Sequence, residues 1–319
     1  MRELSSNTIH SMRQRIITGI VMFLIGVPCV LLGGWYYFIL VAFLAVVAIH
    51  EFISTPNRGR FNIFVYIIVY VATLSFIYWH FVKDQVVFNS IFDDNLFIIE
   101  DLRISTTGIA LYFILLFSVT LISEKFTVAD ATFLFTMGIY IGLAFLCFYY
   151  IRYLPNSFGF YQEERMSSSL LMFYVVIGTT ANDIGAYFVG VLFGKHKMAP
   201  RISPKKTWEG VIGGVVFSVI LSILFAYICD LTGHPLLPGT LDFEGYNFVW
   251  IAVISAIIPV AADMGDLFFS AIKRSFAIKD FGTIFPGHGG VLDRLDSMTF
   301  VCIIVAIIIF FVTHNWTFI

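Results

Sequence analysis

The sequence predicts an all-α, polytopic integral membrane protein, and three observations support this prediction. Hydrophobic residues make up 59% of the 319 residues and charged residues 13%, whereas soluble domains are about 45–50% apolar and about 25% charged. The mean hydropathy is +0.90. The apolar residues gather in runs of roughly 20, the length at which a helix crosses the bilayer core. Runs of this length exclude barrel strands, which alternate over about ten residues.

Nine apolar runs are expected to form transmembrane helices. They cover residues 16–33, 35–54, 61–82, 105–123, 128–151, 169–193, 210–231, 247–272 and 297–314. Gly33 and Gly34 lie between the first two runs, so we expect these two helices to form a tight hairpin.

The basic residues predict an orientation, because Lys and Arg are enriched in cytoplasmic loops. With nine spans and a cytoplasmic N-terminus, 15 of the 19 Lys and Arg residues fall on the cytoplasmic side. We therefore expect a protein of the cytoplasmic (inner) membrane with its N-terminus in the cytoplasm. Nearly all chemistry-bearing residues follow residue 150. We thus expect 1–150 to be a supporting region, for dimerisation or lipid entry, and 151–319 to be the catalytic region.

Charge and cysteine content exclude other classes. The net charge of −2 favours no nucleic-acid partner. The four cysteines are widely spaced, and their spacing indicates neither a zinc site nor a disulfide framework.

The first unusual polar group is Asn182-Asp183, inside the run 169–193. Ionisable residues within a membrane helix are costly and are therefore functional candidates. The alternative is a polar pair that hydrogen-bonds a neighbouring helix, since a lone buried Asp rarely stays ionised without a partner.

The second polar group follows the run 247–272 and its end. At about 100° per residue, its members share one narrow helix face. They are Asp263, Asp266, Ser270, Lys273 and Arg274. Two carboxylates three residues apart are expected to share a divalent cation, while the hydroxyl and the cations hold phosphate oxygens. The alternative is a ladder of ion pairs on a helix surface.

The third polar group is the loop 279–290 and the two aspartates after it. Its glycines reach backbone angles closed to other residues, and its N–H groups are expected to form an anion-binding concavity. Asp293 and Asp296 again stand three residues apart. The alternative is a flexible turn whose aspartates cap the next helix.

A basic loop, 194–209, carries five Lys and Arg residues. Two prolines keep it from continuing as helix. Because it contains Ser-Pro-Lys-Lys-Thr, we favour a role in holding a triphosphate over a general attraction to anionic lipid. It is not a P-loop, since GxxxxGK[ST] does not occur in the sequence.

Carboxylates, hydroxyls and cations near one membrane face together predict Mg²⁺-dependent chemistry on a phosphate-bearing lipid or nucleotide. Carboxylate sites suit Mg²⁺, which also binds substrate phosphates. Phosphoryl transfer chiefly needs metals and cations that neutralise developing charge. All three groups lie at or near the predicted cytoplasmic face, so we expect the active site there.

Two stretches resemble one family. The signature of the phosphatidate cytidylyltransferases, also called CDP-diacylglycerol synthases, is similar to Ser270-x-x-Lys273-Arg274-x-x-x-x-Lys279-Asp280-x-Gly282-x-x-x-Pro286-Gly287-His288-Gly289-Gly290-x-x-Asp293-Arg294-x-Asp296. A second block of that family resembles residues 183–210, including Ser203-Pro204-Lys205-Lys206-Thr207. The resemblance is strong over about 180–297 and weak in the N-terminal half.

The resemblance implies that CTP and phosphatidate, also called phosphatidic acid, react within membrane lipid to give CDP-diacylglycerol and pyrophosphate. It also implies Mg²⁺, which the family pairs with a monovalent ion such as K⁺, and a homodimer. Neither the monovalent ion nor the dimer follows from the composition or the spacing of residues.

Residue roles follow when the polar groups are combined with this resemblance. The expected metal ligands are Asp263, Asp266, Asp293 and Asp296. The residues expected to act in catalysis are Lys273, Arg274, Lys279, His288 and Arg294. The residues expected to bind substrate are Asp183, Ser203, Lys205, Lys206, Ser270, Gly287, Gly289 and Gly290. His288 either orients a phosphate or only shapes the loop. A phosphate dianion needs no general base, so none is assigned.

Two other functions stay open. An ion-coupled transporter would use Asp183, Asp263 and Asp266 as a cation path, but such proteins often show inverted repeats, and the sequence shows no obvious repeat. A related enzyme would apply the same CTP chemistry to another lipid phosphate, which the apolar runs do not distinguish.

Overall fold

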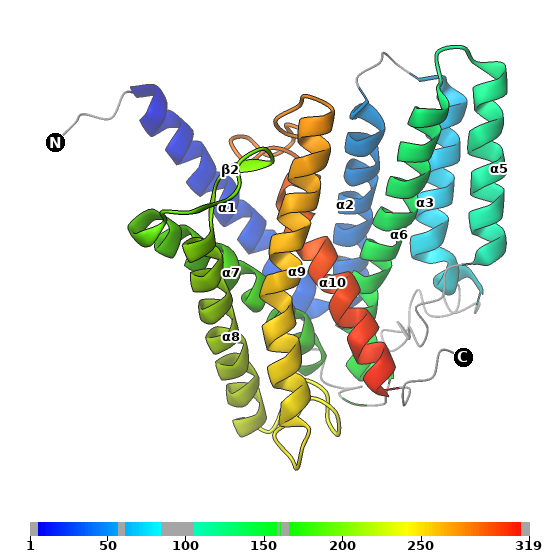
Figure 1. The fold of residues 1–319 in the computed structure, drawn as a ribbon. Helices are drawn as coiled ribbons and strands as arrows, with labels where there is room; N and C mark the ends of the chain where they lie inside the picture. The colour runs from blue at the N-terminus through cyan, green and yellow to red at the C-terminus, as the bar shows by residue number, and fades with distance from the viewer. Residues whose placement is uncertain (1–5, 57–60, 84–104, 158–159, 161–165, 314–319) are drawn as a thin grey trace. The chain divides into compact units, whose positions relative to one another are not determined.

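The computed structural model describes residues 6–56, 61–83, 105–157, 160 and 166–313. These residues form nine α-helices, one short 3-10 helix and a two-stranded hairpin (Figure 1). In chain order they are α1 (Ser6–Leu32), α2 (Gly34–Ser54), α3 (Ile63–Lys83), α5 (Thr106–Ile122), α6 (Val128–Ser157), η1 (Ser167–Ser169), α7 (Leu170–Phe193), β1 (Lys197–Ala199), β2 (Ser203–Thr207), α8 (Trp208–Leu231), α9 (Phe248–Ser275) and α10 (Leu292–Thr313). Each of the nine predicted runs coincides with one of these α-helices.

The helices confirm the prediction of an all-α integral membrane protein. Within the described residues, seven helices are long and apolar enough to cross a membrane by length and composition. Two more contribute shorter apolar stretches, Ile63–Tyr78 and Thr106–Ile122. The count of nine spans and the cytoplasmic N-terminus stay predictions.

Helix ends differ from the ends of the apolar runs. The last helix begins at Leu292, five residues before the predicted run 297–314. Its first turn holds Asp293, and a carboxylate there is stabilised by the positive end of the helix dipole. Hydropathy does not detect such polar first turns, and for this reason the predicted span starts too late.

The basic loop 194–209 contains the hairpin β1–β2, which was not predicted. The strands are antiparallel, with Lys197 opposite Thr207 and Ala199 opposite Ser203. Pro200 lies between the strands and Pro204 is exposed in β2, and an exposed edge strand tolerates a residue without an N–H. The loop does not continue as helix, as predicted, although α7 already ends at Phe193, before either proline. The prolines do not prevent strand pairing.

The chain divides into two compact units that interleave along the sequence. The first unit comprises the described parts of 1–76, 105–142 and 273–295, and the second those of 77–104, 143–272 and 296–319. The predicted division at residue 150 separates two consecutive halves of the chain by their roles and not by their packing. Those roles stay predictions.

In the first unit, α3, α5 and the start of α6 pack closely. The Tyr112 hydroxyl donates to the Leu134 carbonyl at 2.8 Å, and the rings of Phe76 and Tyr112 meet edge to face with centroids 6.0 Å apart. A Cβ on Gly138 would lie 2.5 Å from the Tyr112 hydroxyl. A glycine is therefore needed where α6 approaches α5.

In the second unit, small residues bring α7 and α8 together, as in many membrane helix pairs. The Ser218 hydroxyl donates to the Gly178 carbonyl at 2.7 Å. A Cβ on Gly185 would lie 2.7 Å from the Cβ of Phe217, and one on Gly214 would lie 2.6 Å from Oδ1 of Asn182. This close approach fixes Asn182 and the two ends of the hairpin that joins the helices.

The Gly185→Ala variant tests this packing. Overpacking costs about 1–3 kcal/mol, more than the roughly 1 kcal/mol that Ala gains over Gly in a helix. We expect a lower unfolding temperature, measured by fluorescence in detergent. The control is Gly19→Ala, because no atom lies within 4 Å of a Cβ there. Equal unfolding temperatures for the two variants would contradict the close contact.

Candidate active site

In the second unit, Lys206 of β2 meets the two aspartates of α9. Its Nζ lies 2.8 Å from Oδ1 of Asp263 and 2.9 Å from Oδ2 of Asp266. Residues three apart lie on the same side of a helix, so both carboxylates reach one cation. The structure thus brings the pair together as expected, and the cation that they share here is a lysine ammonium.

Lys206 is a buried cation, with a side chain 14% exposed. Burial alone would lower the pKa of this amine, but the carboxylates of Asp266 and Asp263 raise it, and the net pKa is above its ordinary value. The lysine therefore stays charged and neutralises one of the two negative charges beside it.

Two buried oxygens beside this ion pair have no hydrogen-bond partner among the described residues. They are Oδ2 of Asp263 and Oδ1 of Asn182. The Asn182 amide donates to the other carboxylate oxygen of Asp263 at 3.5 Å. An unsatisfied buried acceptor costs about 1–3 kcal/mol, so these oxygens suit a ligand that brings positive charge.

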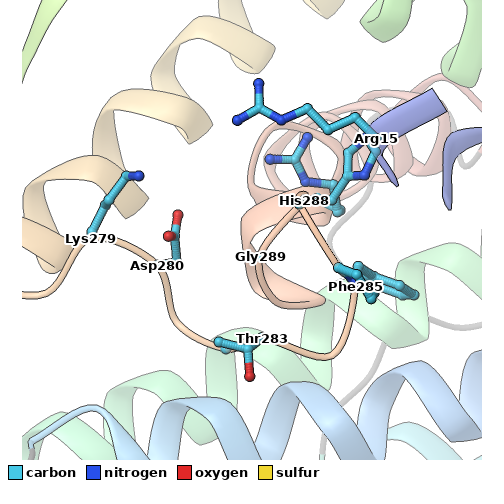
Figure 2. Close-up of a pocket in the computed structure, with 11 residues that line it drawn as sticks. Arg15, Lys279, Asp280, Thr283, Phe285, His288 and Gly289 are labelled. Atoms are coloured by element: carbon cyan, nitrogen blue, oxygen red, sulfur yellow. The ribbon is translucent and has the colours of Figure 1, made fainter. Parts of the chain in front are cut away.

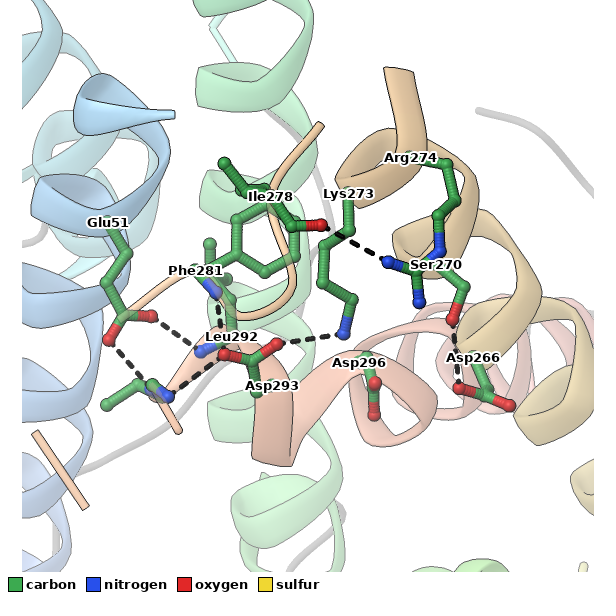
Figure 3. A network of polar contacts seen from close by, with 12 residues as sticks. Glu51, Asp266, Ser270, Lys273, Arg274, Ile278, Phe281, Leu292, Asp293 and Asp296 are labelled. Atoms are coloured by element: carbon green, nitrogen blue, oxygen red, sulfur yellow. Dashed lines mark hydrogen bonds and ion pairs between the residues drawn. The ribbon is translucent and has the colours of Figure 1, made fainter. Parts of the chain in front are cut away.

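The other predicted residues of this unit differ in exposure. Ser270 donates to Oδ1 of Asp266 at 3.5 Å (Figure 3).

Asp183 is exposed on α7, whereas its neighbour Asn182 is buried. Lys205 is exposed on β2. Ser203 is half-buried at the start of β2. Asp296, on α10, is half-buried and its Oδ1 accepts the Ser297 N–H at 2.8 Å.

In the first unit, Asp293 holds the loop that precedes α10. Its Oδ1 accepts from Lys273 Nζ at 2.8 Å, and its Oδ2 accepts from the N–H groups of Phe281 at 2.7 Å and Gly290 at 3.0 Å (Figure 3). Lys273 and Asp293 are both buried. Asp293, in the first turn of α10, therefore holds the preceding loop through two N–H groups and pairs with the Lys273 ammonium.

Glu51 of α2 is a functional candidate that sequence reasoning missed. This carboxylate is buried, 4% exposed, and accepts from the N–H groups of Val291 at 2.8 Å and Leu292 at 2.9 Å. The first N–H groups of a helix lack intrahelical partners. The Glu51 carboxylate accepts from two N–H groups at the start of α10. A carboxylate within the apolar run 35–54 could have identified Glu51 as a candidate. It was missed because it lies far from the motifs in the sequence.

Gly282 and Gly290 border the same carboxylate. A Cβ on either residue would collide with the Glu51 side chain. The glycines of the motif thus allow the loop to pass directly over Glu51, and this requirement is steric.

The loop 285–290 forms a tight turn around Pro286 and Gly287. The His288 N–H donates to the Phe285 carbonyl at 2.8 Å, and Gly287 has φ 77°, as position i+2 of a type II turn requires. The N–H groups of His288, Gly289 and Gly290 all donate to acceptors within the protein. Three of the four N–H groups of residues 287–290, where the anion-binding concavity was expected, are therefore engaged within the protein. Side chains rather than these amides face a ligand.

A cavity of about 570 Å³ opens beside this turn (Figure 2). Lys279, His288 and Arg294 are among its lining residues. Burial, followed by the positive charges of Arg294 and Arg15, lowers the pKa of His288, so the imidazole is neutral at pH 7. Arg274 is exposed and donates to the Ile278 carbonyl at 3.3 Å.

The oxygens of the second unit fit Mg²⁺ in number and kind. No group of three or more His, Cys, Asp or Glu side chains suited to a metal occurs in the part of the chain that the structure describes. Mg²⁺ is usually held by one or two carboxylates together with water and substrate phosphates. Asp263 and Asp266 provide two such carboxylates.

Comparisons with known proteins are consistent with this chemistry. A model of the cytidylyltransferase family matches residues 13–312. A phosphatidate cytidylyltransferase of Staphylococcus haemolyticus is 32% identical over 298 residues, covering 91% of this chain and 96% of the relative. One of Bacillus subtilis is 31% identical over 292 residues, covering 91% and 94%. One of Staphylococcus aureus is 36% identical over 194 residues, covering 60% and 64%.

Glu51→Gln tests the clamp on α10. The amide group places an N–H₂ against one backbone donor, so we expect a loss of about 1–3 kcal/mol in unfolding free energy. Amide hydrogen exchange at residues 285–295, measured by mass spectrometry, should accelerate. The control is Glu124→Gln, at an exposed glutamate of the same unit. Unchanged exchange in Glu51→Gln would show that Glu51 does not hold the loop.

Proposed function

Because this chain belongs to the cytidylyltransferase family and is an integral membrane protein, we propose that it transfers the cytidylyl group of CTP to phosphatidate. The products are CDP-diacylglycerol and pyrophosphate. One structural observation carries the proposal. Two aspartates of α9 meet at a single cation, beside buried oxygens that have no partner among the described residues.

The reaction is a displacement at phosphorus. A phosphate oxygen of phosphatidate attacks the α-phosphorus of CTP, the bond from that phosphorus to the bridging oxygen of the β-phosphate breaks, and pyrophosphate leaves with the electron pair. A phosphate dianion is already a nucleophile, so no side chain needs to remove a proton. The protein's task is to position two anions and to neutralise their charge.

Asp263 and Asp266 would hold Mg²⁺ in the second unit. Bound there, the ion would supply positive charge to phosphate oxygens. Lys206 keeps this carboxylate pair partly neutral and is a candidate for contact with the triphosphate, together with Lys205 and Ser203 of the same strand. Asp293 and Asp296 stay predicted ligands, although both oxygens of Asp293 are engaged in this structure. A monovalent ion such as K⁺ also stays a prediction.

In the first unit, Lys279 and Arg294 line the cavity, and we assign them to anion binding. Lys273 holds Asp293 at 2.8 Å, so its role includes positioning the loop. Arg274, Asp183, Ser270 and Gly287 keep their predicted roles in catalysis or substrate binding. Gly289 and Gly290 stay predicted substrate-binding residues, although their N–H groups donate within the protein in this structure. His288 is neutral at pH 7 and suits hydrogen bonding to a phosphate better than charge neutralisation.

The location follows from the substrates. CTP is cytoplasmic and the phosphatidate headgroup lies at the membrane interface, so we infer an active site at the cytoplasmic face of the inner membrane. We also infer a homodimer, as the family resemblance implies, which light scattering in detergent would measure.

Pyrophosphate release tests the function directly. Purified protein receives CTP, phosphatidate and Mg²⁺, with each omitted in turn. We expect release only when all three are present, together with formation of a CDP-linked lipid. Release with another lipid phosphate but not with phosphatidate would change the substrate. No release with any lipid, from folded protein, would contradict the enzyme and favour the transporter.

Asp263→Asn tests the carboxylate pair. The amide removes a negative ligand, so we expect kcat/KM to fall by at least about a hundredfold. Lys206 keeps Asp266 as a partner, so the protein should still fold, with a lower unfolding temperature because one charge of the buried group is lost. The control is Asp230→Asn, at an aspartate whose Oδ1 accepts the Phe243 N–H. Similar turnover in the two variants would exclude the assignment of Asp263 to the metal.

Lys206→Met tests the basic hairpin. A charge-assisted contact contributes about 1.5–3 kcal/mol, so we expect the KM for CTP to rise by about tenfold or more while the KM for phosphatidate stays nearly constant. Lys125→Met, at an exposed lysine in the turn before α6, serves as control. A larger effect on phosphatidate than on CTP would reassign the hairpin to the lipid.

A further inference from the structure

The cavity in the first unit contains a cation from a helix outside the family motifs. Arg15 of α1 lines it together with Lys279 and Arg294, which come from the loop and α10 (Figure 2). All three side chains are exposed. Among the described residues, the ion pairs found involve other cations. Uncompensated cations around one cavity indicate an anionic ligand.

The charge of the cavity matches a phosphate monoester. Its lining contains three cations and one carboxylate, Asp280, so its net charge is about +2 with His288 neutral. A phosphate monoester carries about −1.5 to −2 at pH 7. The guanidinium groups of Arg15 and Arg294 also present paired N–H donors, which suit phosphate oxygens. Both the net charge and the hydrogen-bond donors of the cavity therefore indicate a phosphate monoester as the ligand.

The position of Arg15 is tied to the loop by a neighbouring side chain. One turn further along α1, the Thr18 hydroxyl lies 3.1 Å from the Pro286 carbonyl and 2.9 Å from the Gln14 carbonyl, so its single proton is shared between these two acceptors. This contact joins α1 to the turn that borders the cavity. Arg15 is thereby held where the loop presents His288 and Gly287.

The helix that supplies Arg15 continues as an apolar surface. Ile16 is 60% exposed, Phe23 66% and Leu24 63%, and none of the apolar window of Gln14–Leu32 is buried. A ligand whose phosphate lies in the cavity therefore meets a helix that exposes apolar side chains in the turns that follow Arg15. Acyl chains would use that face, whereas a nucleotide has no part that would.

We propose that this cavity binds the phosphate of the lipid substrate, with Arg15 as a phosphate ligand and the exposed side of α1 bordering the acyl chains. The inference rests on the proposed function and assigns a substrate to one part of its site. It gives the N-terminal helix a direct role in recognising phosphatidate.

Arg15→Gln separates the lipid from the nucleotide. With dioctanoyl phosphatidate in detergent, we expect the KM for phosphatidate to rise by about tenfold or more and the KM for CTP to change less than about twofold. Arg15→Lys keeps the charge but not the paired donors. Its KM for phosphatidate should lie between those of Arg15→Gln and the unaltered protein. Lys125→Gln, at an exposed lysine of the same unit, should match the unaltered protein. A rise in the KM for CTP alone, or no change in either KM, would overturn the assignment.

A binding measurement keeps the test independent of turnover. Unfolding temperature is followed with dioctanoyl phosphatidate, dioctanoyl phosphatidylcholine or inorganic phosphate. We expect stabilisation of the unaltered protein by phosphatidate only, and loss of most of that shift in Arg15→Gln. Equal stabilisation by inorganic phosphate would overturn the role of α1 in holding the chains. Stabilisation that depends on Arg15, in a protein that makes no CDP-diacylglycerol, would support the cavity and refute the proposed function.

Discussion

The cost of keeping charge away from water governs the polar groups of this protein. Each buried carboxylate among Glu51, Asp263 and Asp293 is met by donors, either a lysine or the N–H groups at a helix start. Breaking a buried pair leaves an uncompensated charge, which costs several kcal/mol. The loop before α10 and the hairpin β1–β2 are therefore fixed by the charges that they neutralise.

The family resemblance is confirmed, and the sequence predicted the helical fold well because run length reflects bilayer thickness. The i, i+3 spacing of Asp263 and Asp266 likewise predicted that both carboxylates lie on one side of the helix, since helix geometry fixes that relation. The divalent cation that they were expected to share stays a prediction. The partner of the pair was not predictable in the same way. Lys206 lies 60 residues from Asp266, and only tertiary structure brings a strand to that face of α9.

The glycines of the motif were expected for one physical reason, and the structure supports another. Gly289 and Gly290 were expected to offer N–H groups to a phosphate, but both donate within the protein. Gly290 and Gly282 instead make room for Glu51. A sequence pattern identifies where a side chain is excluded, but not whether a ligand or another side chain fills the space.

The contact of Glu51 with α10 also constrains how the protein is made. The carboxylate enters with the second helix, while its N–H partners lie 240 and 241 residues later. At about 5–20 residues per second, synthesis of that interval takes roughly 12–48 seconds. During this time α2 carries its charge without the partners of the finished protein. Assembly of the loop before α10 is therefore a late event in biogenesis, after nearly every other helix has been synthesised.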